Sequence, residues 1–599
     1  MSESFTRGHR RVAAAVALGC VAALGLAPAA SAAPGGGKGP KDAVTITVMG
    51  TSDLHGYIEN WDYFTNTEYD DAAHNDVGLA KVSALVNQVR AERGEESTLL
   101  IDNGDTIQGT SLTDYYANVE SVTDTGETHP MAAAMNAMGY DATTLGNHEF
   151  NYGLPLLRTY EEQLDFPLLG ANAKDWETGA DAFTPYVLKT VKLKGQKPIH
   201  VGILGLTTPG SAIWDKNNVE GELRFLGMVE QAQKYVPEMK AAGADVVVVS
   251  SHSGPSGTSS YGGGLPVENA STLIAEQVPG IDAILAGHEH QEIPERFVTN
   301  KQTGDQVLLT EPKNWGQRLS VMDFELTKVR GQWDVISANS ELLNTNTVAA
   351  DPKISALAAE QHQRVIDYVN TPIGTATETM SAAESRIRDT AVMDFVNTVQ
   401  AEAVDRALEG TADADLPVLS IVAPFNRAAV IPQGPVTIRD MAGLYVFPNT
   451  LFGVEMTGGQ VKDYLEYSAK YFHQSAPGAP VDPTALTNAA GTPDYNYDMM
   501  SGVSYDIDIS KPVGQRITNL SYNGAPIDTA QRFAVATNNY RQSGGGNFPH
   551  IATAPVLVNQ TTEIRQLLID YLIAEGTIDP ATFFEENWQL TRNGEPVFG

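Results

Sequence analysis

The chain has 599 residues, with 39 lysines and arginines against 73 aspartates and glutamates, and a formal net charge of −34. Its 42% hydrophobic and 19% charged residues are ordinary for a folded protein with a sizeable core. The acidic balance argues against binding polymeric nucleic acid, whose phosphates would stay unneutralised. The only cysteine, Cys20, excludes a disulfide framework and any metal site built from thiolates. A metal ion would therefore need His, Asp, Glu or Asn ligands.

The N-terminal residues 1–32 have the pattern of a signal peptide. Basic residues precede the apolar run 12–26, and small residues at 30–32 provide a cleavage site. The run is shorter than the ~20 apolar residues that span a bilayer. Residues 33–43 read as a Gly/Pro-rich linker. We expect a secreted or cell-surface-associated protein with no transmembrane segment in the mature chain, while the oligomeric state stays open.

From residue 44 onward, short apolar runs alternate with amphipathic helical patterns. Helices are expected at 79–93 and 228–242. Such alternation predicts an α/β fold with buried strands. The expected strands are 44–49, 98–101, 142–145, 200–206, 245–249 and 283–285.

Beyond about residue 330 this alternation breaks. One long helix is expected over 352–369, stopped before Pro372, and a second helical pattern covers 390–408. Turn-rich stretches follow. The predicted division is an N-terminal domain, a connecting helix and a smaller C-terminal domain over residues 44–345, 346–371 and 372–590.

Side chains that commonly bind metal ions follow five of the apolar runs. In an open α/β sheet, residues beyond the carboxyl ends of the strands collect in one crevice, so these segments are expected to converge. Carboxylate, amide and imidazole ligands without thiolate suit Zn, Mn or Co. Seven candidate ligands predict two ions, which ~3.5–4 Å apart would polarise a phosphate oxygen and activate a bridging water. The segments are Asp53-Leu54-His55, Asn103-Gly104-Asp105, Gly146-Asn147-His148-Glu149, Ser251-His252 and Gly287-His288-Glu289-His290.

In this order the motifs resemble the binuclear metallophosphoesterase (calcineurin-like) superfamily, with its D-x-H, G-D, G-N-H-[ED], later His and G-H-x-H pattern. Segments 51–56, 103–105 and 145–150, with YRQSGGG at 540–546, resemble more specifically the exported bacterial 5′-nucleotidase family. The resemblance covers nearly the whole chain after the linker. It implies an α/β fold in which a four-layer N-terminal domain, a β-sandwich flanked by helices, precedes a smaller α+β nucleotidase domain.

The resemblance also implies two divalent metal ions that share one aspartate. His148 matches the histidine that stabilises the developing phosphate charge and protonates the leaving oxygen, without being a ligand itself. The implied ligands are Asp53, His55 and His290 for one ion, Asn147, His252 and His288 for the other, and Asp105 for both.

One departure from the 5′-nucleotidase pattern is informative. Three residues after His148 that branch usually has an aspartate, whereas this chain has Asn151. An amide orients His148 but does not stabilise its cation as a carboxylate would. The segment GNHEFNYGL, with 60–64 and 103–109, resembles instead the branch that opens 2′,3′-cyclic nucleotides and dephosphorylates 3′-nucleotides.

We therefore expect an exported, metal-dependent hydrolase of nucleotide phosphoesters with that substrate preference. One alternative is a 5′-nucleotidase or nucleotide-sugar diphosphatase on the same scaffold. The other is a non-catalytic exported protein that binds nucleotides or metal ions.

The resemblance implies that the C-terminal domain binds the base and sugar of the small-molecule nucleotide substrate. By position, Phe447 and Tyr540 are the aromatic rings that would enclose a flat base, with Asn449 beside them. Arg388 and Arg427 are candidates for substrate contact, because a guanidinium matches a phosphate bidentately.

Overall fold

The computed structural model describes residues 43–261, 264–479 and 482–598. The predicted signal peptide and nearly all of the predicted linker lie outside the described residues. From residue 44 on, the chain forms one compact unit. Among the residues described, every helix is too short or too polar to cross a membrane.

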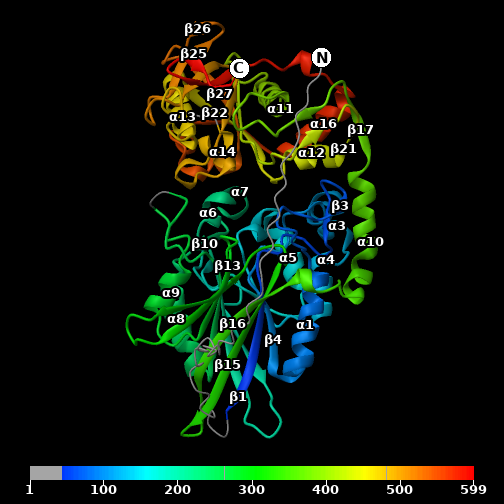
Figure 1. Ribbon diagram of the computed structural model, residues 1–599, viewed down its shortest axis with the longest axis vertical. Helices are drawn as coiled ribbons and strands as arrows, with labels where there is room; N and C mark the ends of the chain where they lie inside the picture. Colours follow the sequence, from blue (N-terminus) through cyan, green and yellow to red (C-terminus); the bar gives the residue numbers. More distant parts are fainter. Residues whose placement is uncertain (1–42, 262–263, 480–481, 599) are drawn as a thin grey trace, which may run out of the picture. The chain divides into compact units, whose positions relative to one another are not determined.

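Two β-sheets form the centre of the N-terminal part (Figure 1). In the larger sheet the four central strands run parallel, as do β1 and β4 of the smaller one. The smaller sheet has the order β16 (Gln332–Asn344), β15 (Arg318–Val329), β1 (Val44–Thr51), β4 (Thr98–Asp102). The larger sheet has the order β13 (Glu292–Thr299), β14 (Gln306–Pro312), β12 (Ala283–Ala286), β11 (Val246–His252), β9 (Ile199–Thr207), β8 (Tyr186–Val191).

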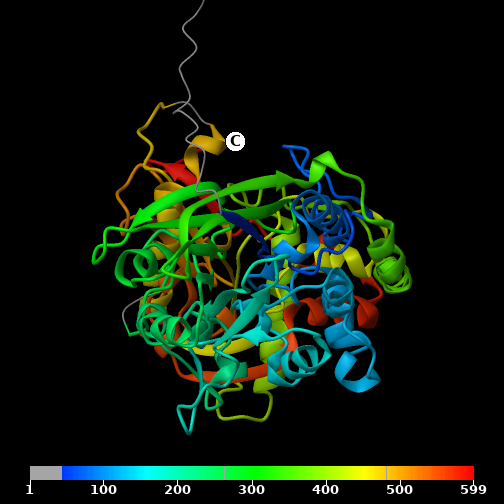
Figure 2. The same cartoon turned by 90° about the horizontal axis from the view of Figure 1, so that it is seen from below.

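The two sheets pack face to face, and helices cover their outer faces. Apolar side chains such as Val48, Val248 and Met322 fill the space between the sheets. Because both faces are covered, these strands read as continuous apolar runs. The order helix, sheet, sheet, helix gives the four layers that the family resemblance implied (Figures 1 and 2). The covering helices are α1 (Leu79–Arg93), α4 (Pro130–Met138) and α5 (Gly153–Gln163) on one side and α8 (Met228–Ala241) and α9 (Ser271–Gln277) on the other.

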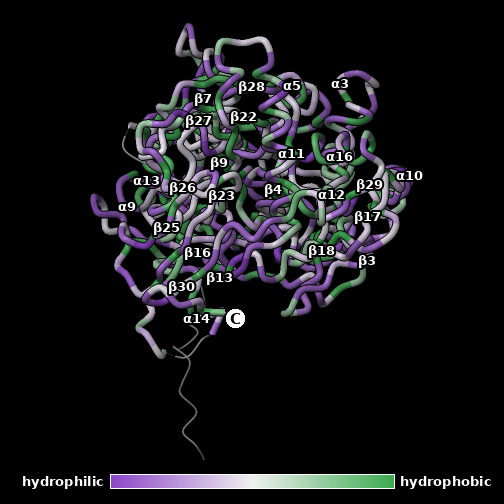
Figure 3. Tube along the Cα trace, turned by 90° about the horizontal axis from the view of Figure 1, so that it is seen from above, coloured by the Kyte–Doolittle hydropathy of each residue, from purple (hydrophilic) through white to green (hydrophobic). Residues whose placement is uncertain are grey.

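Helix α10 (Pro352–Val369) has the predicted bounds. Asp351 begins it by accepting a hydrogen bond from the Lys353 backbone N–H, and Pro352 occupies the first helical position. Its buried residues lie on one stripe, and the rest of the helix is mostly hydrophilic (Figure 3). The stripe consists of Ile354, Ala358, Val365 and Val369.

The C-terminal part is an α+β arrangement around one apolar core. Helix α11 (Ala391–Leu408), one residue shorter than predicted, packs on its first sheet. That sheet has the order β23 (Met499–Ser501), β19 (Val418–Val422), β27 (Arg532–Asn538), β22 (Thr450–Thr457), β28 (Val556–Glu563). A second sheet has the order β26 (Ala525–Pro526), β25 (Ile517–Tyr522), β24 (Ser504–Asp508), β30 (Trp588–Arg592), β31 (Glu595–Pro596).

Candidate active site

The five predicted segments meet at the carboxyl ends of β1, β4, β5 (Thr143–Thr144), β11 and β12. Backbone hydrogen bonds join the first two loops: the Asp53 N–H donates to Gly104 O at 2.9 Å, and the His55 N–H to Asp105 O at 2.7 Å. The loops after neighbouring parallel strands therefore hold each other in place.

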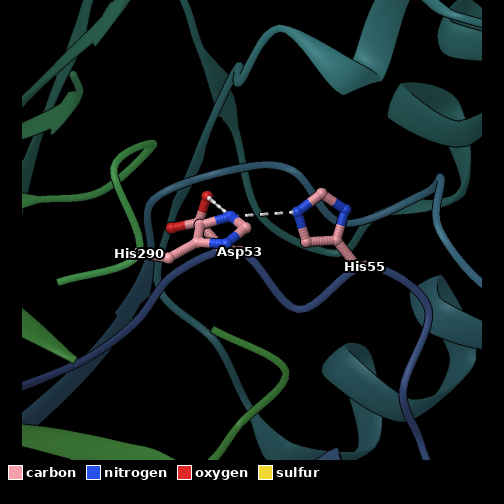
Figure 4. A group of neighbouring side chains, drawn as sticks. All are labelled: Asp53, His55 and His290. Carbon is pink, nitrogen blue, oxygen red and sulfur yellow. Dashed lines mark hydrogen bonds and ion pairs between the residues drawn. The ribbon is translucent and has the colours of Figure 1, made fainter. Parts of the chain in front are cut away.

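Six of the seven predicted ligands form two groups, within each of which the candidate ligand atoms lie within 4.8 Å of one another. In the first group the His290 ring lies between the other two side chains (Figure 4), with Nε2 3.3 Å from Asp53 Oδ1 and 3.4 Å from His55 Nε2. The groups are Asp53, His55 and His290, and Asp105, His252 and His288.

Asp105 connects the two groups. Its Oδ2 lies 3.0 Å from His252 Nε2 and 3.9 Å from His55 Nε2, and its side chain is almost fully buried. One carboxylate oxygen thus faces a ring nitrogen from each group, which is the position a bridging ligand needs.

Three buried ligand atoms at this point make no regular hydrogen bond in the described part of the chain. Asp105 Oδ2 and His252 Nε2 face each other at 3.0 Å as an ion pair, and Asn147 Oδ1 has no partner among the described residues. A buried polar atom without a partner costs about 1–3 kcal/mol. All three belong to predicted ligands, and a divalent cation would satisfy them together. The donor set of carboxylate, amide and imidazole atoms suits such an ion.

The other ring nitrogens of three histidines are occupied, which fixes the rings. His55 Nδ1 lies 2.9 Å from Gln108 O, and His252 Nδ1 lies 2.7 Å from Asn103 O. His288 Nε2 lies 2.9 Å from the buried carboxylate of Glu268. Outer partners of this kind set the tautomer and leave the second nitrogen free to ligate.

Five of the seven predicted ligands have left-handed backbone, with φ between 47° and 74°. Non-glycine residues adopt this region rarely, and such strain concentrates at functional sites. The five are Asp53, His55, Asp105, His288 and His290.

Charges at the site are strongly coupled. Burial raises the pKa of Asp53, but His290 and His252 outweigh it and bring the pKa to about 2. Burial lowers the pKa of His252, but Asp105 and Asp53 raise it to about 10. Burial lowers the pKa of His55 to about 4. The metal-free site thus keeps Asp53 ionised and His252 protonated at neutral pH, and a cation binding there would displace that proton.

Glu149 stabilises the loops rather than facing the ligand atoms. Its Oε2 accepts from the backbone N–H groups of Asp105 at 2.8 Å and Gly146 at 2.6 Å, and its Oε1 accepts from Thr106 N–H. Burial and the charge of Asp105 raise its pKa to about 7. This residue lies inside a predicted motif, but no sequence pattern indicated its role.

Replacing Glu149 with Gln is expected to lower the free energy of unfolding by about 1–3 kcal/mol. In the unmodified protein both carboxylate oxygens of Glu149 accept from backbone N–H groups. In the variant one of these oxygens becomes an NH₂ group, so at least one backbone N–H loses its acceptor. Urea denaturation of the metal-free protein measures this, with Glu162→Gln on the exposed surface of α5 as the control. Equal stability of the two variants would contradict the assignment.

His148 lies at the same point but outside both ligand groups. Its backbone N–H donates to Asp105 Oδ1 at 2.7 Å, and its ring centroid lies 5.2 Å from that of His55. Its Nδ1 lies 2.6 Å from Asn151 Oδ1, so the amide orients the ring as the sequence suggested.

Four further residues at the site were missed. Trp214 stacks on His288, with ring centroids 5.5 Å apart, and Glu268 holds the same histidine. Asp215 accepts a hydrogen bond from Asn151. Tyr495 lines the cleft described next. None belongs to a motif, so only their positions in the fold reveal them.

A cleft of about 1130 Å³ extends from the ligand groups to the C-terminal part. Asp105, Asn147 and His148 line one end, and Phe447, Asn449 and Tyr540 line the other. The Phe447 ring centroid lies 5.3 Å from Phe425 and 6.5 Å from Tyr495, both of which also line the cleft. A side chain at Gly545 would come within 2.5 Å of the Tyr540 ring, so that ring needs glycine beside it.

The two predicted arginines are not among the residues that line this cleft. Arg427 Nε lies 2.8 Å from Asp494 Oδ2. Arg388 Nε lies 3.5 Å from Glu384 Oε2, and its guanidinium lies over the Phe598 ring. Both engage acidic partners that the sequence pattern did not indicate, so their contact with a substrate stays a prediction.

Comparison with known proteins agrees with this geometry. Residues 46–292 match the calcineurin-like phosphoesterase family, and residues 372–553 match the 5′-nucleotidase C-terminal domain. The chain is 34% identical to the trifunctional nucleotide phosphoesterase protein YfkN of Bacillus subtilis over 93% of its own length, but spans only 39% of that protein. It is 35% identical to the 2′,3′-cyclic-nucleotide 2′-phosphodiesterase/3′-nucleotidase of Haemophilus influenzae, over 92% of this chain and 88% of the relative.

Among solved structures, a candidate 5′-nucleotidase from Staphylococcus aureus, in complex with alpha-ketoglutarate, superimposes with a TM-score of 0.72. It is 28% identical, and the match covers 92% of this chain and all of that one. The resemblance predicted from the motifs is confirmed. The chain belongs to the calcineurin-like phosphoesterases that carry a 5′-nucleotidase C-terminal domain, a family of hydrolases that act on nucleotide phosphoesters.

Proposed function

We propose that this protein is an exported, metal-dependent enzyme that opens 2′,3′-cyclic nucleotides and dephosphorylates 3′-nucleotides to nucleosides. The observation that carries the proposal is the pair of ligand groups joined by Asp105 at one end of an aromatic-lined cleft. Similarity to the Haemophilus influenzae enzyme supports the substrate preference. The signal-peptide pattern of residues 1–32 supports export.

Two divalent ions of the Zn, Mn or Co type suit the donor atoms. When bound, such ions would supply Lewis acidity toward the phosphate and lower the pKa of a water that attacks phosphorus. The first group would hold one ion, and His252, His288 and Asn147 the other. Asp105 would hold both, because its carboxylate faces a histidine of each group.

His148 is proposed to donate a proton to the ribose oxygen that leaves. Its Nδ1–H donates to Asn151 Oδ1, so the donating form is the imidazolium, which carries its second hydrogen on Nε2, the nitrogen available to the cleft that the residue lines. Opening a 2′,3′-cyclic phosphate breaks the bond to the 2′ oxygen, which takes up this proton. A second hydrolysis then breaks the bond to the 3′ oxygen and releases phosphate and nucleoside.

The far end of the cleft is proposed to hold the nucleoside. Phe447, Tyr540 and Tyr495 offer ring faces, and stacking of a base on such a face contributes ~1–3 kcal/mol without strong base preference. Asn449 supplies a polar edge. The division at 44–345, 346–371 and 372–590 stays our proposal, supported by the two family matches, each of which lies within one proposed domain.

A 5′-nucleotidase is the second candidate, favoured by the similarity to the Staphylococcus aureus structure. The amide at Asn151 weighs against it, because the 5′-nucleotidase pattern has a carboxylate there. A non-catalytic binding protein would not need His148 oriented beside the ligand groups.

The direct test is release of phosphate and nucleoside by the protein loaded with Mn²⁺, with 2′,3′-cAMP, 3′-AMP and 5′-AMP as parallel substrates. We expect turnover of the first two, and at least about tenfold lower kcat/KM for 5′-AMP, because the cleft must place a different phosphate at the metal groups. Turnover of 5′-AMP alone would establish the second candidate. Nucleotide binding without phosphate release would establish a binding protein.

A further inference from the structure

Asp215 is a buried carboxylate that no motif contains and that lines the cleft together with His148 and Asn151. It lies between α6 (Ser211–Trp214) and α7 (Lys216–Val219) and is only 3% exposed. Its Oδ1 accepts a hydrogen bond from Asn151 Nδ2 at 2.6 Å. Its Oδ2 is buried and has no hydrogen-bond partner in the described part of the protein.

The same segment holds the Asn151 backbone. Asn218 Nδ2 donates to the carbonyl oxygens of Phe150 at 2.9 Å and Asn151 at 3.0 Å. The neighbouring Trp214 stacks on His288. Residues 214–218 therefore contact both the segment that orients His148 and one of the candidate metal ligands.

The contact with Asp215 decides which way the Asn151 amide faces. Asp215 Oδ1 accepts, so the amide NH₂ must face it, and Asn151 Oδ1 must then face His148 Nδ1. An acceptor at that distance requires the hydrogen on Nδ1. If the amide turned over, its NH₂ would face Nδ1 and require the opposite tautomer.

This arrangement does not depend on the protonation of Asp215. Burial raises its pKa to about 8, although the hydrogen bond from Asn151 lowers it. A proton would occupy Oδ2, which has no partner, and Oδ1 would still accept from Asn151. Among the residues described, only one of the two oxygens of this buried carboxylate has a hydrogen-bond partner, so Asp215 adds little to the stability of the fold. This favours a role in function.

We propose that Asp215 is a positioning residue that acts through Asn151 to keep a hydrogen on His148 Nδ1 and to hold the ring, so that Nε2 is the nitrogen that carries the transferred proton. The chain His148–Asn151–Asp215 would replace a direct histidine–carboxylate pair. The inference rests on the proposed role of His148 as the donor to the leaving oxygen.

The test uses Asp215→Leu, which removes the acceptor at similar size, and Asp215→Asn, which keeps an acceptor oxygen. We expect Asp215→Leu to lower kcat on 3′-AMP about 10–100-fold, as for other outer partners of site residues. Turnover of p-nitrophenyl phosphate should change little, because p-nitrophenolate leaves without a proton. Asp215→Asn should recover most of the loss, and metal content should equal that of the unmodified protein. Asp165→Leu on the exposed surface controls for the substitution itself.

Coupling to Asn151 separates positioning from a general structural effect. In an Asn151→Ala background, adding Asp215→Leu should lower kcat no further, because without the Asn151 amide Asp215 no longer acts on His148. Equal losses on both esters, a lower metal content, or a full additional loss in that background would each overturn the inference.

Failure of the proposed function would be seen in the unmodified protein, before any variant is compared with it. If that protein prefers 5′-AMP, the same comparison is made with 5′-AMP as the ribose ester, and the inference about Asp215 is still decided. If it hydrolyses neither nucleotides nor p-nitrophenyl phosphate, both proposals are overturned.

Discussion

Replacing Asp105 with Asn or Ala is expected to lower kcat on 3′-AMP by about 10³-fold or more. A metal clamp stabilises the transition state by several kcal/mol, and each 1.36 kcal/mol is a factor of ten in rate. Asp105 faces both ligand groups, with Oδ2 3.0 Å from His252 Nε2 and 3.9 Å from His55 Nε2. Its loss should therefore disturb both ions rather than one.

Metal analysis makes this prediction specific. The unmodified protein should bind two ions per chain, and the Asp105 variants fewer. Asp105→Asn keeps an oxygen that accepts from the His148 backbone N–H, so the loop should stay in place. A loss of activity in this variant is then due to the missing negative charge between the two ligand groups. Asp70→Asn, which removes an exposed charge, is the control. Two tightly bound ions with near-normal turnover in Asp105→Asn would contradict the bridging role.

Apolar runs in the sequence were sufficient to predict most of the strands that carry the site, and helical periodicity predicted the bounds of two helices. Helices α1 and α10 have the predicted bounds, because each buries one face and begins or ends at a glycine or a capped proline. The apolar run 142–145 is a weaker case, because only Thr143 and Thr144 pair, with β6 (Leu168–Leu169). Run length alone does not reveal how far a partner strand extends.

Convergence of the ligands was also predictable, because parallel strands place their carboxyl ends at one edge. The left-handed backbone at Asp53, His55 and Asp105 was not, since sequence patterns assign that conformation to glycine. Asp215 lies 64 residues beyond Asn151 in sequence, and only folding brings the two side chains together. The same holds for Glu268 and His288, which no periodic pattern connects.

Replacing His148 with Ala is expected to lower kcat on 3′-AMP about 10²–10⁴-fold, the usual contribution of a positioned acid. Metal content should stay at the level of the unmodified protein, because His148 belongs to neither ligand group. His148 lines the cleft beside Asp105 and Asn147, and Asn151 engages its Nδ1, so Nε2 is the nitrogen that would meet a leaving ribose oxygen.

The leaving group distinguishes the two roles that His148 could have. A ribose alkoxide needs a proton as it departs, whereas p-nitrophenolate does not. If His148 is the acid, His148→Ala should lose far more activity on 3′-AMP than on p-nitrophenyl phosphate. Equal losses on the two esters would instead assign His148 to the charge developing on the phosphate, which both reactions share. His473→Ala, an exposed histidine that does not line the cleft, should leave both rates unchanged.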